Sequence, residues 1–369
     1  MGLKVGIVGL PNVGKSTLFN AITAAQVEAA NYPFATINPN TGMVAVPDKR
    51  LTYLSQAFNP LKTIAATVEF VDIAGLVKGA SKGEGLGNKF LSHIRECDAI
   101  VEVVRAFESS EIIHVENSVD AKRDIEIINF ELIMADIETL NKRRTKVETK
   151  ARVNKDKDAM FELEIIDIIL EALNKEIPAR RIKKLNNIQL EFARKNYFLL
   201  TLKPLIYVAN IAEDDYMTFE DNPQYQAISQ IAELENTSVI AVSCAIEGEL
   251  SSLSEVEKNE YLTSLGASES GLDKVIKAAY KLLGLQTFFT VGKDEVKAWT
   301  FIKGMTAPQC AGVIHTDFTR GFIKAEVYHY VDFVELKSEQ AIKDAGKLRI
   351  EGKEYVVKDG DIMFFRFNV

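Results

Sequence analysis

The stretch that decides the fold reads Lys4-Val5-Gly6-Ile7-Val8-Gly9-Leu10-Pro11-Asn12-Val13-Gly14-Lys15-Ser16-Thr17-Leu18-Phe19. Its apolar first part predicts a buried strand, and the spacing of Leu18 and Ile22 predicts a helix after the glycine-rich turn. Gly9, four further residues and then Gly14-Lys15-Ser16 match the phosphate-binding loop in full. Glycine suits this loop because the chain must fold around a phosphate with its amides pointing inward, a shape that a Cβ would obstruct. The stretch therefore predicts a nucleotide-binding protein.

The residues of this loop share the work of holding a nucleotide. The helix after the loop offers unpaired N–H groups and the positive end of its dipole to a phosphate. Lys15 is expected to reach the β- and γ-phosphates and to act in catalysis by neutralising charge there, while the Ser16 hydroxyl is expected to bind Mg²⁺. The residues of this stretch expected to contact the nucleotide are Asn12, Val13, Gly14, Lys15, Ser16 and Thr17.

Length and composition limit the class of protein. A chain of 369 residues predicts two or three domains, and 47% hydrophobic with 26% charged residues is ordinary globular composition. The three cysteines are far apart and odd in number, which fits a reducing compartment. The phosphate-binding loop lies where a signal peptide would need an apolar run, and no run reaches the length of about 18 residues that a membrane span needs. We expect a cytoplasmic protein with no membrane contact.

The charge is uneven along the chain. The net charge is −8, but residues 141–200 hold 15 lysines and arginines against 9 aspartates and glutamates, a net of +6, which leaves −14 for the remainder. A basic segment on an acidic protein indicates a specialised contact face, for example one for ribosomal RNA. A solvated helical surface would give the same count, so the composition leaves both interpretations open.

Two further motifs complete a predicted metal site. Residues 31–39 hold two prolines and two asparagines without a helical period, which indicates a loop, and Thr36 in this loop is the candidate that completes the Mg²⁺ shell. Thr67–Asp72 predicts a buried strand, and a carboxylate at the tip of such a strand holds the metal in P-loop enzymes. The predicted metal ligands are Ser16, Thr36 and Asp72, and the Gly75 amide is expected to contact the γ-phosphate.

Two residues, Leu76 and His114, bear on how the attacking water is positioned. Signalling GTPases place a glutamine where this chain has Leu76, and leucine cannot orient water, so slow hydrolysis is expected. His114, in the connection beyond the strand predicted over 99–104, could position the water or donate a hydrogen bond. The alternative is an ordinary exposed loop histidine.

The middle of the chain predicts a helical insertion. Apolar residues recur at helical spacing on both sides of a polar run at 154–158, which favours two long antiparallel helices with a hairpin tip at that run, followed by further helix over 185–200. Strands resume at 204–210. The insertion therefore lies between two strands of the nucleotide-binding domain.

The next strand ends in a motif that reads the base. Asn210-Ile211-Ala212-Glu213 lies where GTPases carry Asn-Lys-x-Asp, in which the aspartate pairs with guanine. Glu213 is one methylene longer, and a displaced carboxylate leaves the guanine donors poorly paired. Adenine could instead be bound by backbone groups around Ile211. The strand predicted over 238–243 brings Ser243 to the same base-binding edge, and 271–283 predicts the closing helix.

The pattern changes again at about residue 284. Short strands are predicted over 288–291, 298–302, 323–327, 355–358 and 361–367, with a helical piece at 311–315. One helix on a small mixed sheet is the β-grasp arrangement, so we expect a β-grasp domain at the C-terminus.

These motifs resemble those of the YchF/Obg-like ATPase family, a branch of the Obg-related P-loop GTPases, over essentially the whole chain. The residues that carry the resemblance are the phosphate-binding loop, Asn31-Tyr32-Pro33-Phe34-Ala35-Thr36-Ile37, Asp72-Ile73-Ala74-Gly75-Leu76-Val77-Lys78-Gly79-Ala80 and Asn210-Ile211-Ala212-Glu213. The resemblance implies hydrolysis of ATP in preference to GTP, Mg²⁺ on Ser16 and Thr36, association with ribosomes, and a C-terminal domain of the TGS type. It also implies that His114 replaces the missing glutamine and that Asn12 helps to hold K⁺.

The sequence thus predicts an α/β fold: a doubly wound P-loop NTPase sheet with an inserted helical hairpin and a C-terminal β-grasp, TGS-like domain. The expected domains are 1–122 with 201–283 for the nucleotide, 123–200 for the insertion and 284–369 for the TGS-like domain. The expected function is that of a slow, ribosome-associated, Mg²⁺-dependent ATPase with weaker GTPase activity. The alternatives are an Obg-type GTPase, or a ribosome- or RNA-binding module in which nucleotide only sets the conformation.

Overall fold

The computed structural model describes residues 3–24, 40–73, 86–153 and 155–368. The chain forms two compact units, one of residues 1–42 with 69–275 and one of residues 43–68 with 276–369. Residues 43–68 thus belong to the unit that contains the C-terminus, a contribution that no pattern in the sequence indicated. The three-part domain division stays a prediction.

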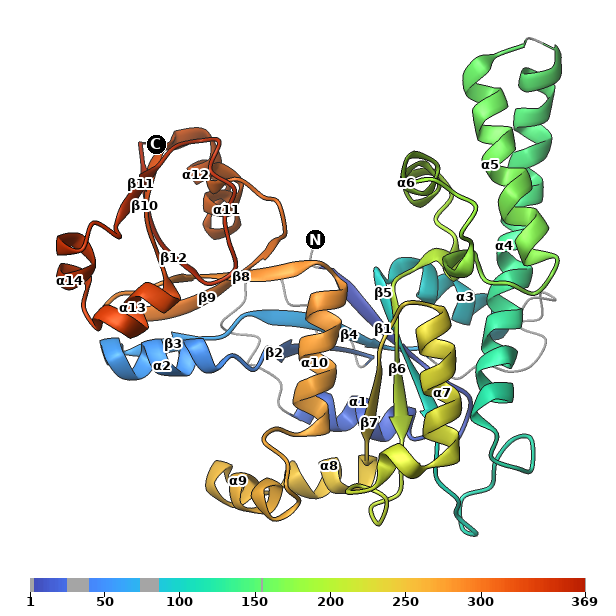
Figure 1. Ribbon diagram of the computed structural model, residues 1–369, viewed down its shortest axis with the longest axis horizontal. Helices are drawn as coiled ribbons and strands as arrows, with labels where there is room; N and C mark the ends of the chain where they lie inside the picture. The colour runs from blue at the N-terminus through green and yellow to red at the C-terminus, as the bar shows by residue number, and fades with distance from the viewer. Residues whose placement is uncertain (1–2, 25–39, 74–85, 154, 369) are drawn as a thin grey trace. The chain divides into compact units, whose positions relative to one another are not determined.

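The first sheet has the strand order β2-β4-β1-β5-β6-β7 (Figure 1). The pairs β4–β1, β1–β5, β5–β6 and β6–β7 are all parallel. Every residue of β5 and β6 is buried, as in a parallel sheet that is covered on both faces. The six strands are β1 (Lys4–Val8), β2 (Thr41–Ala45), β4 (Thr67–Asp72), β5 (Ala99–Arg105), β6 (Leu205–Asn210) and β7 (Val239–Val242).

Helices connect the parallel strands, as the right-handed crossovers of a doubly wound fold require. Helix α1 follows β1 directly and contacts α8, while α4 contacts both β5 and α7. The helices of the first unit outside the insertion are α1 (Lys15–Ala24), α3 (Leu86–Glu96), α7 (Pro223–Leu234), α8 (Cys244–Leu250) and α9 (Glu255–Ser264), and α10 (Gly271–Leu282) continues into the second unit.

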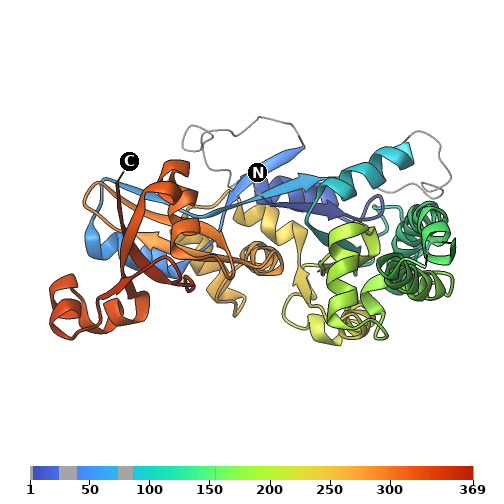
Figure 2. The same cartoon turned by 90° about the horizontal axis from the view of Figure 1, so that it is seen from above.

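The insertion is a pair of long helices, α4 (Ala121–Val153) and α5 (Lys157–Leu173), which run side by side in Figure 1 and are seen end-on in Figure 2. Asp156 caps α5 by accepting from two backbone amides of its first turn, which places the reversal within the predicted polar run. Apolar residues spaced seven apart on α4, at Ile133, Leu140 and Val147, join the isoleucines of α5 in one core. Helix α6 (Asn187–Asn196) lies within the predicted third helical segment.

A buried aspartate ties the end of the insertion to its first helix. Asp136 on α4 accepts from the backbone amides of Leu200 and Thr201, each at 2.8 Å, and from the Thr201 hydroxyl at 2.6 Å. Burial nevertheless raises the pKa of Asp136 to about 6. This anchor fixes where the chain leaves the insertion and enters β6.

The second unit contains a six-stranded sheet of order β11-β10-β12-β8-β9-β3. Helix α11 packs on it through Ala307, Cys310 and Ala311, which share a core with Phe288 and Phe365. The strands are β3 (Lys62–Ile64), β8 (Leu285–Thr290), β9 (Glu295–Ile302), β10 (Phe322–His329), β11 (Arg349–Glu351) and β12 (Asp361–Phe367); the helices are α2 (Lys49–Phe58), α11 (Ala307–Ile314), α12 (Thr316–Gly321), α13 (Tyr330–Leu336) and α14 (Glu339–Asp344).

One predicted strand of this unit is wrong. Residues 355–358 form only an isolated bridge, between Val356 and Thr306, and β10 pairs with β12 and with β11, a strand that the sequence pattern did not reveal. The backbone of the 355–358 segment bonds to the start of α11 instead, because Tyr355 accepts from the Ala307 amide and Val357 donates to the Met305 carbonyl. The predicted fold class, an α/β P-loop domain with a helical insertion and a mixed C-terminal sheet, is confirmed.

Candidate functional site

The phosphate-binding loop joins β1 to α1 and has the backbone that its glycines predict. Gly14 has φ +94° and Asn12 has φ +64°, both in the left-handed region that favours glycine and tolerates asparagine. A Cβ at Gly14 would collide with the side-chain amide of Asn210, and one at Gly9 would lie 2.8 Å from the Val103 carbonyl oxygen. The neighbouring elements therefore leave room only for backbone at these two positions.

Two predicted site residues meet beside this loop. The Lys15 ammonium, on a residue only 8% exposed, forms an ion pair with the Asp72 carboxylate. The pair forms because β1 and β4 are adjacent and parallel, with Ile7 opposite Asp72, so both chains end at the same edge of the sheet. The carboxylate compensates the charge of the buried lysine, and a phosphate could take its place.

The donor atoms near the loop fit a magnesium ion. The Asp72 carboxylate and the Ser16 hydroxyl are hard oxygen ligands, the type that Mg²⁺ prefers, and Ser16 lies exposed on the first turn of α1 together with Thr17. Among the residues that the structure describes, no group of three or more His, Cys, Asp or Glu side chains could hold a metal by itself. A magnesium ion bound here would take its remaining ligands from substrate phosphates and water. Thr36 and Gly75, predicted for the metal and the γ-phosphate, lie outside the described residues, as does Leu76.

Asn210 connects the loop to the base-binding edge. Its side-chain amide donates to the Val13 carbonyl at 2.9 Å, and its side-chain oxygen accepts from the Cys244 amide at 3.2 Å. Asn210 is 3% exposed, so both hydrogen bonds are shielded from water. One carboxamide thus holds the phosphate loop, the tip of β6 and the start of α8 together.

The other predicted base-binding residues lie at the same edge. Ile211 is buried, and its amide donates to the Val242 carbonyl, whereas Glu213 is exposed. Ser243 is also buried, and its hydroxyl has no partner among the described residues. A buried hydroxyl without a partner is costly, so a ligand that supplies one would bind favourably there.

Cys244 follows Ser243 directly and begins α8. Its thiol donates to the Gly14 carbonyl at 3.7 Å, directly behind the phosphate loop. Burial raises the pKa of Cys244 to about 12, so the thiol stays protonated and serves as a small donor rather than a nucleophile. Cys97 and Cys310 are also buried and free of disulfides.

His114 is buried rather than exposed on a loop. Its Nδ1 accepts from the Glu116 amide at 3.1 Å, which leaves the proton on Nε2, and Nε2 donates to Asp124 at 2.8 Å. Both ring nitrogens are therefore used, one by the connection between β5 and α4 and the other by the first turn of α4. A role for His114 in positioning water stays a prediction, and it requires that these two bonds be exchanged for others.

A buried arginine that the sequence pattern did not single out shapes this connection. Arg105 ends β5 at 1% exposure, donates to the carbonyls of Phe107 and Ile112, and lies over the Phe107 ring at 4.4 Å. The side-chain amide of Asn12 donates to the next carbonyl, that of Ile113, at 3.1 Å. The connection that carries His114 is thus held at one end by Arg105 and touches the phosphate loop through Asn12.

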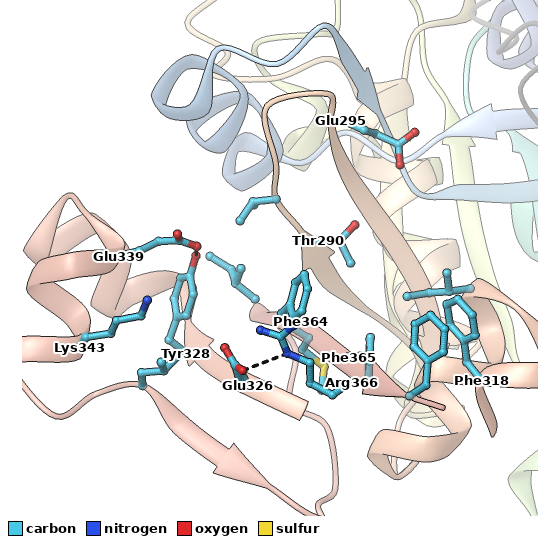
Figure 3. Close-up of a pocket in the computed structure, with 16 residues that line it drawn as sticks. Thr290, Glu295, Phe318, Glu326, Tyr328, Glu339, Lys343, Phe364, Phe365 and Arg366 are labelled. Carbon is cyan, nitrogen blue, oxygen red and sulfur yellow. Dashed lines mark hydrogen bonds and ion pairs between the residues drawn. The ribbon is translucent and has the colours of Figure 1, made fainter. Parts of the chain in front are cut away.

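The second unit has a cavity of its own, with a volume of about 350 Å³. Figure 3 shows Phe318 at one end and Tyr328 with Glu339 at the other, and the Arg366–Glu326 ion pair lies between them. None of the predicted site residues lines it. Among the described parts of the chain, no helix is long and apolar enough to span a lipid bilayer.

Two family models match the chain. Residues 4–135 match MMR_HSR1, described as a 50S ribosome-binding GTPase. Residues 285–368 match YchF-GTPase_C, described as a protein of unknown function (DUF933). The two matches fall on the phosphate-binding loop with its neighbouring strands and on the C-terminal sheet.

Curated relatives match over the full length. The Ribosome-binding ATPase YchF of Bacillus subtilis (strain 168) is 56% identical over 369 residues, and that of Escherichia coli O157:H7 is 52% identical over 370, with all of each chain covered. The solved structure of the Schizosaccharomyces pombe YchF GTPase is 42% identical, with a TM-score of 0.88 over 99% of this chain and 98% of that one. The chain belongs to the YchF family.

Proposed function

We propose that this chain is a ribosome-associated ATPase, which hydrolyses ATP slowly to ADP and phosphate and thereby switches conformation in translation or the stress response. The observation that carries the proposal is the phosphate loop, in which Asn12 and Gly14 have a left-handed backbone and Lys15, at the start of α1, pairs with Asp72. Full-length relatives carry the name Ribosome-binding ATPase, and ribosome association would place the chain in the cytoplasm.

Hydrolysis of a terminal phosphate needs little covalent chemistry from the protein, because positioning and charge neutralisation supply most of the rate enhancement. Lys15 would leave Asp72 for the phosphates, and the loop amides would orient them. Ser16, Asp72 and Thr36 would hold Mg²⁺, which when bound neutralises phosphate charge. Asn12 would contribute to a K⁺ site, and His114 or a residue of the ribosome would position the water.

The preference for ATP rests on the base-binding edge. Guanine recognition needs a carboxylate held beside the ring, and Glu213 is exposed, whereas Ile211 places a buried apolar side chain where GTPases carry a lysine. The unpartnered Ser243 hydroxyl can bond to a base of either type. A site that fails to pair the guanine donors loses most of its selectivity for GTP.

Direct titration tests this preference. We expect MgATP to bind at least about tenfold more tightly than MgGTP, equivalent to about 1.4 kcal/mol, and phosphate release from ATP to rise when ribosomes are added. Tighter binding of GTP would establish the alternative of an Obg-type GTPase. Nucleotide-dependent pelleting with ribosomes without any hydrolysis would favour a binding module in which nucleotide only sets the conformation.

A further inference from the structure

A basic groove is lined by residues of α3, of the middle of α4 and of the segment at 197–198. Its volume is about 540 Å³. Four cations line it, Arg95 from α3 and Lys142, Arg143 and Lys146 from α4, against the single carboxylate of Glu138. None of these residues belongs to the nucleotide site described above.

Two of the four cations form close ion pairs, and the charge of Arg95 also acts on the Glu138 carboxylate. Lys142 lies 2.5 Å from Glu138, and Arg143 lies 2.6 Å from Glu162. Arg95 and Lys146, both exposed, form no ion pair with any residue in the described parts of the chain. The groove therefore presents positive charge that an anionic partner would neutralise.

An aromatic residue in an unusual conformation borders the same groove. Phe198 is 72% exposed and has φ +53°, a left-handed backbone that is rare for a bulky side chain. Its neighbours Tyr197 and Leu199 are buried at 5% and 2%, so the chain turns this one ring outward while its neighbours anchor the core. Such strain is found where the surroundings hold a residue in place for contact with a ligand.

From these observations we infer that the groove binds an unpaired segment of RNA, with backbone phosphates on Arg95 and Lys146 and a base stacked on Phe198. Proteins that hold single-stranded nucleic acid combine a positive groove with exposed aromatic rings in this way. An acidic protein segment would use the cations but would leave the aromatic ring without a partner. The inference rests on the proposed ribosome association, and it names ribosomal RNA as the component that this groove contacts.

The structure also excludes another part of the basic segment from this role. Arg180 and Arg181 both form ion pairs with Glu235, whose side chain is fully buried, at 2.6 and 2.8 Å. They stabilise the first unit and are not free to bind phosphates. Lys183 and Lys184 are exposed on the same insertion but lie outside the groove lining, so they offer a matched control of equal charge.

The test compares two charge reversals, Arg95→Glu with Lys146→Glu and Lys183→Glu with Lys184→Glu. Binding is measured by fluorescence anisotropy with a short labelled oligouridylate over a range of salt concentrations. The groove variant should bind at least about tenfold more weakly than the wild type, and its slope of log K against log salt should fall by about 1.4, the value for two lost single-strand contacts. The control variant should bind like the wild type.

The ring is tested by Phe198→Ala, which should weaken oligouridylate binding about tenfold at an unchanged salt slope, with Phe198→Trp restoring it. Affinity for MgATP reports whether each variant is folded, and Arg95→Gln with Lys146→Gln replaces the reversal if it is not. Equal RNA binding by groove variant and wild type, equal losses in groove and control variants, or equally tight binding of polyglutamate would overturn the inference. If the wild type does not pellet with ribosomes, the proposed function fails; if wild type and groove variant pellet alike, only this inference fails.

Discussion

Replacement of Asn210 by alanine should destabilise the first unit and weaken nucleotide binding together. The side chain makes two hydrogen bonds, one to the phosphate loop at Val13 and one to the start of α8 at Cys244. Alanine can make neither hydrogen bond, so the Val13 carbonyl and the Cys244 amide lose their partners. Each buried group left without a partner costs about 1–3 kcal/mol. We expect a loss of about 3 kcal/mol in the free energy of unfolding.

Thermal unfolding and MgATP titration measure the two effects. For a unit of this size, about 3 kcal/mol corresponds to a fall in Tm of roughly 6–12 °C. The matched control is Asn259→Ala, since Asn259 lies exposed on α9 and alanine is a better helix former. MgATP affinity of the Asn210→Ala protein, measured well below its Tm, should fall because the loop loses one of its supports. An unchanged Tm together with an unchanged affinity would refute this assignment of Asn210.

Three further changes test separate parts of the structure. Burial raises the pKa of Glu102 to about 8 from 4.5 and leaves its carboxyl without a partner among the described residues. The folded protein therefore keeps a proton that the unfolded chain releases, so wild-type stability should fall by up to about 1.4 kcal/mol per pH unit between these values and level off above pH 8. Glu102→Gln should lack this slope in melts from pH 5 to 9, and an identical slope would contradict the assignment. Arg180→Ala should lower the free energy of unfolding, measured by chemical denaturation, by about 3 kcal/mol, because the buried Glu235 keeps its charge and loses a buried ion-pair partner. A change below about 0.5 kcal/mol would be inconsistent with this. Asp72→Asn should raise the Mg²⁺ concentration needed for half-maximal ATP hydrolysis, with thermal melts to verify that the variant, which loses the partner of Lys15, is folded; an unaltered Mg²⁺ dependence would remove Asp72 from the metal site.

The sequence predicted the parts of the site that depend on local pattern. The phosphate loop, the strand that ends in Asp72 and the strand that ends in Asn210 each carry their chemistry within a few residues, and the parallel sheet then brings their ends together. Lys15 and Asp72 meet for this reason.

The parts that sequence reasoning missed depend on partners far along the chain. Strand β3 is three residues long and pairs with β9, more than two hundred residues away, so no local signal placed residues 43–68 in the second unit. A charge count likewise could not reveal that Arg180 faces a buried glutamate. His114 lies in a connection with no periodic pattern, and its burial follows from Asp124 on the next helix.

The central claim is that Lys15 and the loop around it hold the triphosphate for hydrolysis. Phosphate release from MgATP, measured for the wild type, Lys15→Ala and the exposed-lysine control Lys122→Ala, tests it most directly, with thermal melts to verify folding. The account predicts a fall of at least about 100-fold for Lys15→Ala, because the removed ammonium is the charge that meets the phosphates, and no change for the control. Hydrolysis by a folded Lys15→Ala protein at the wild-type rate would contradict it.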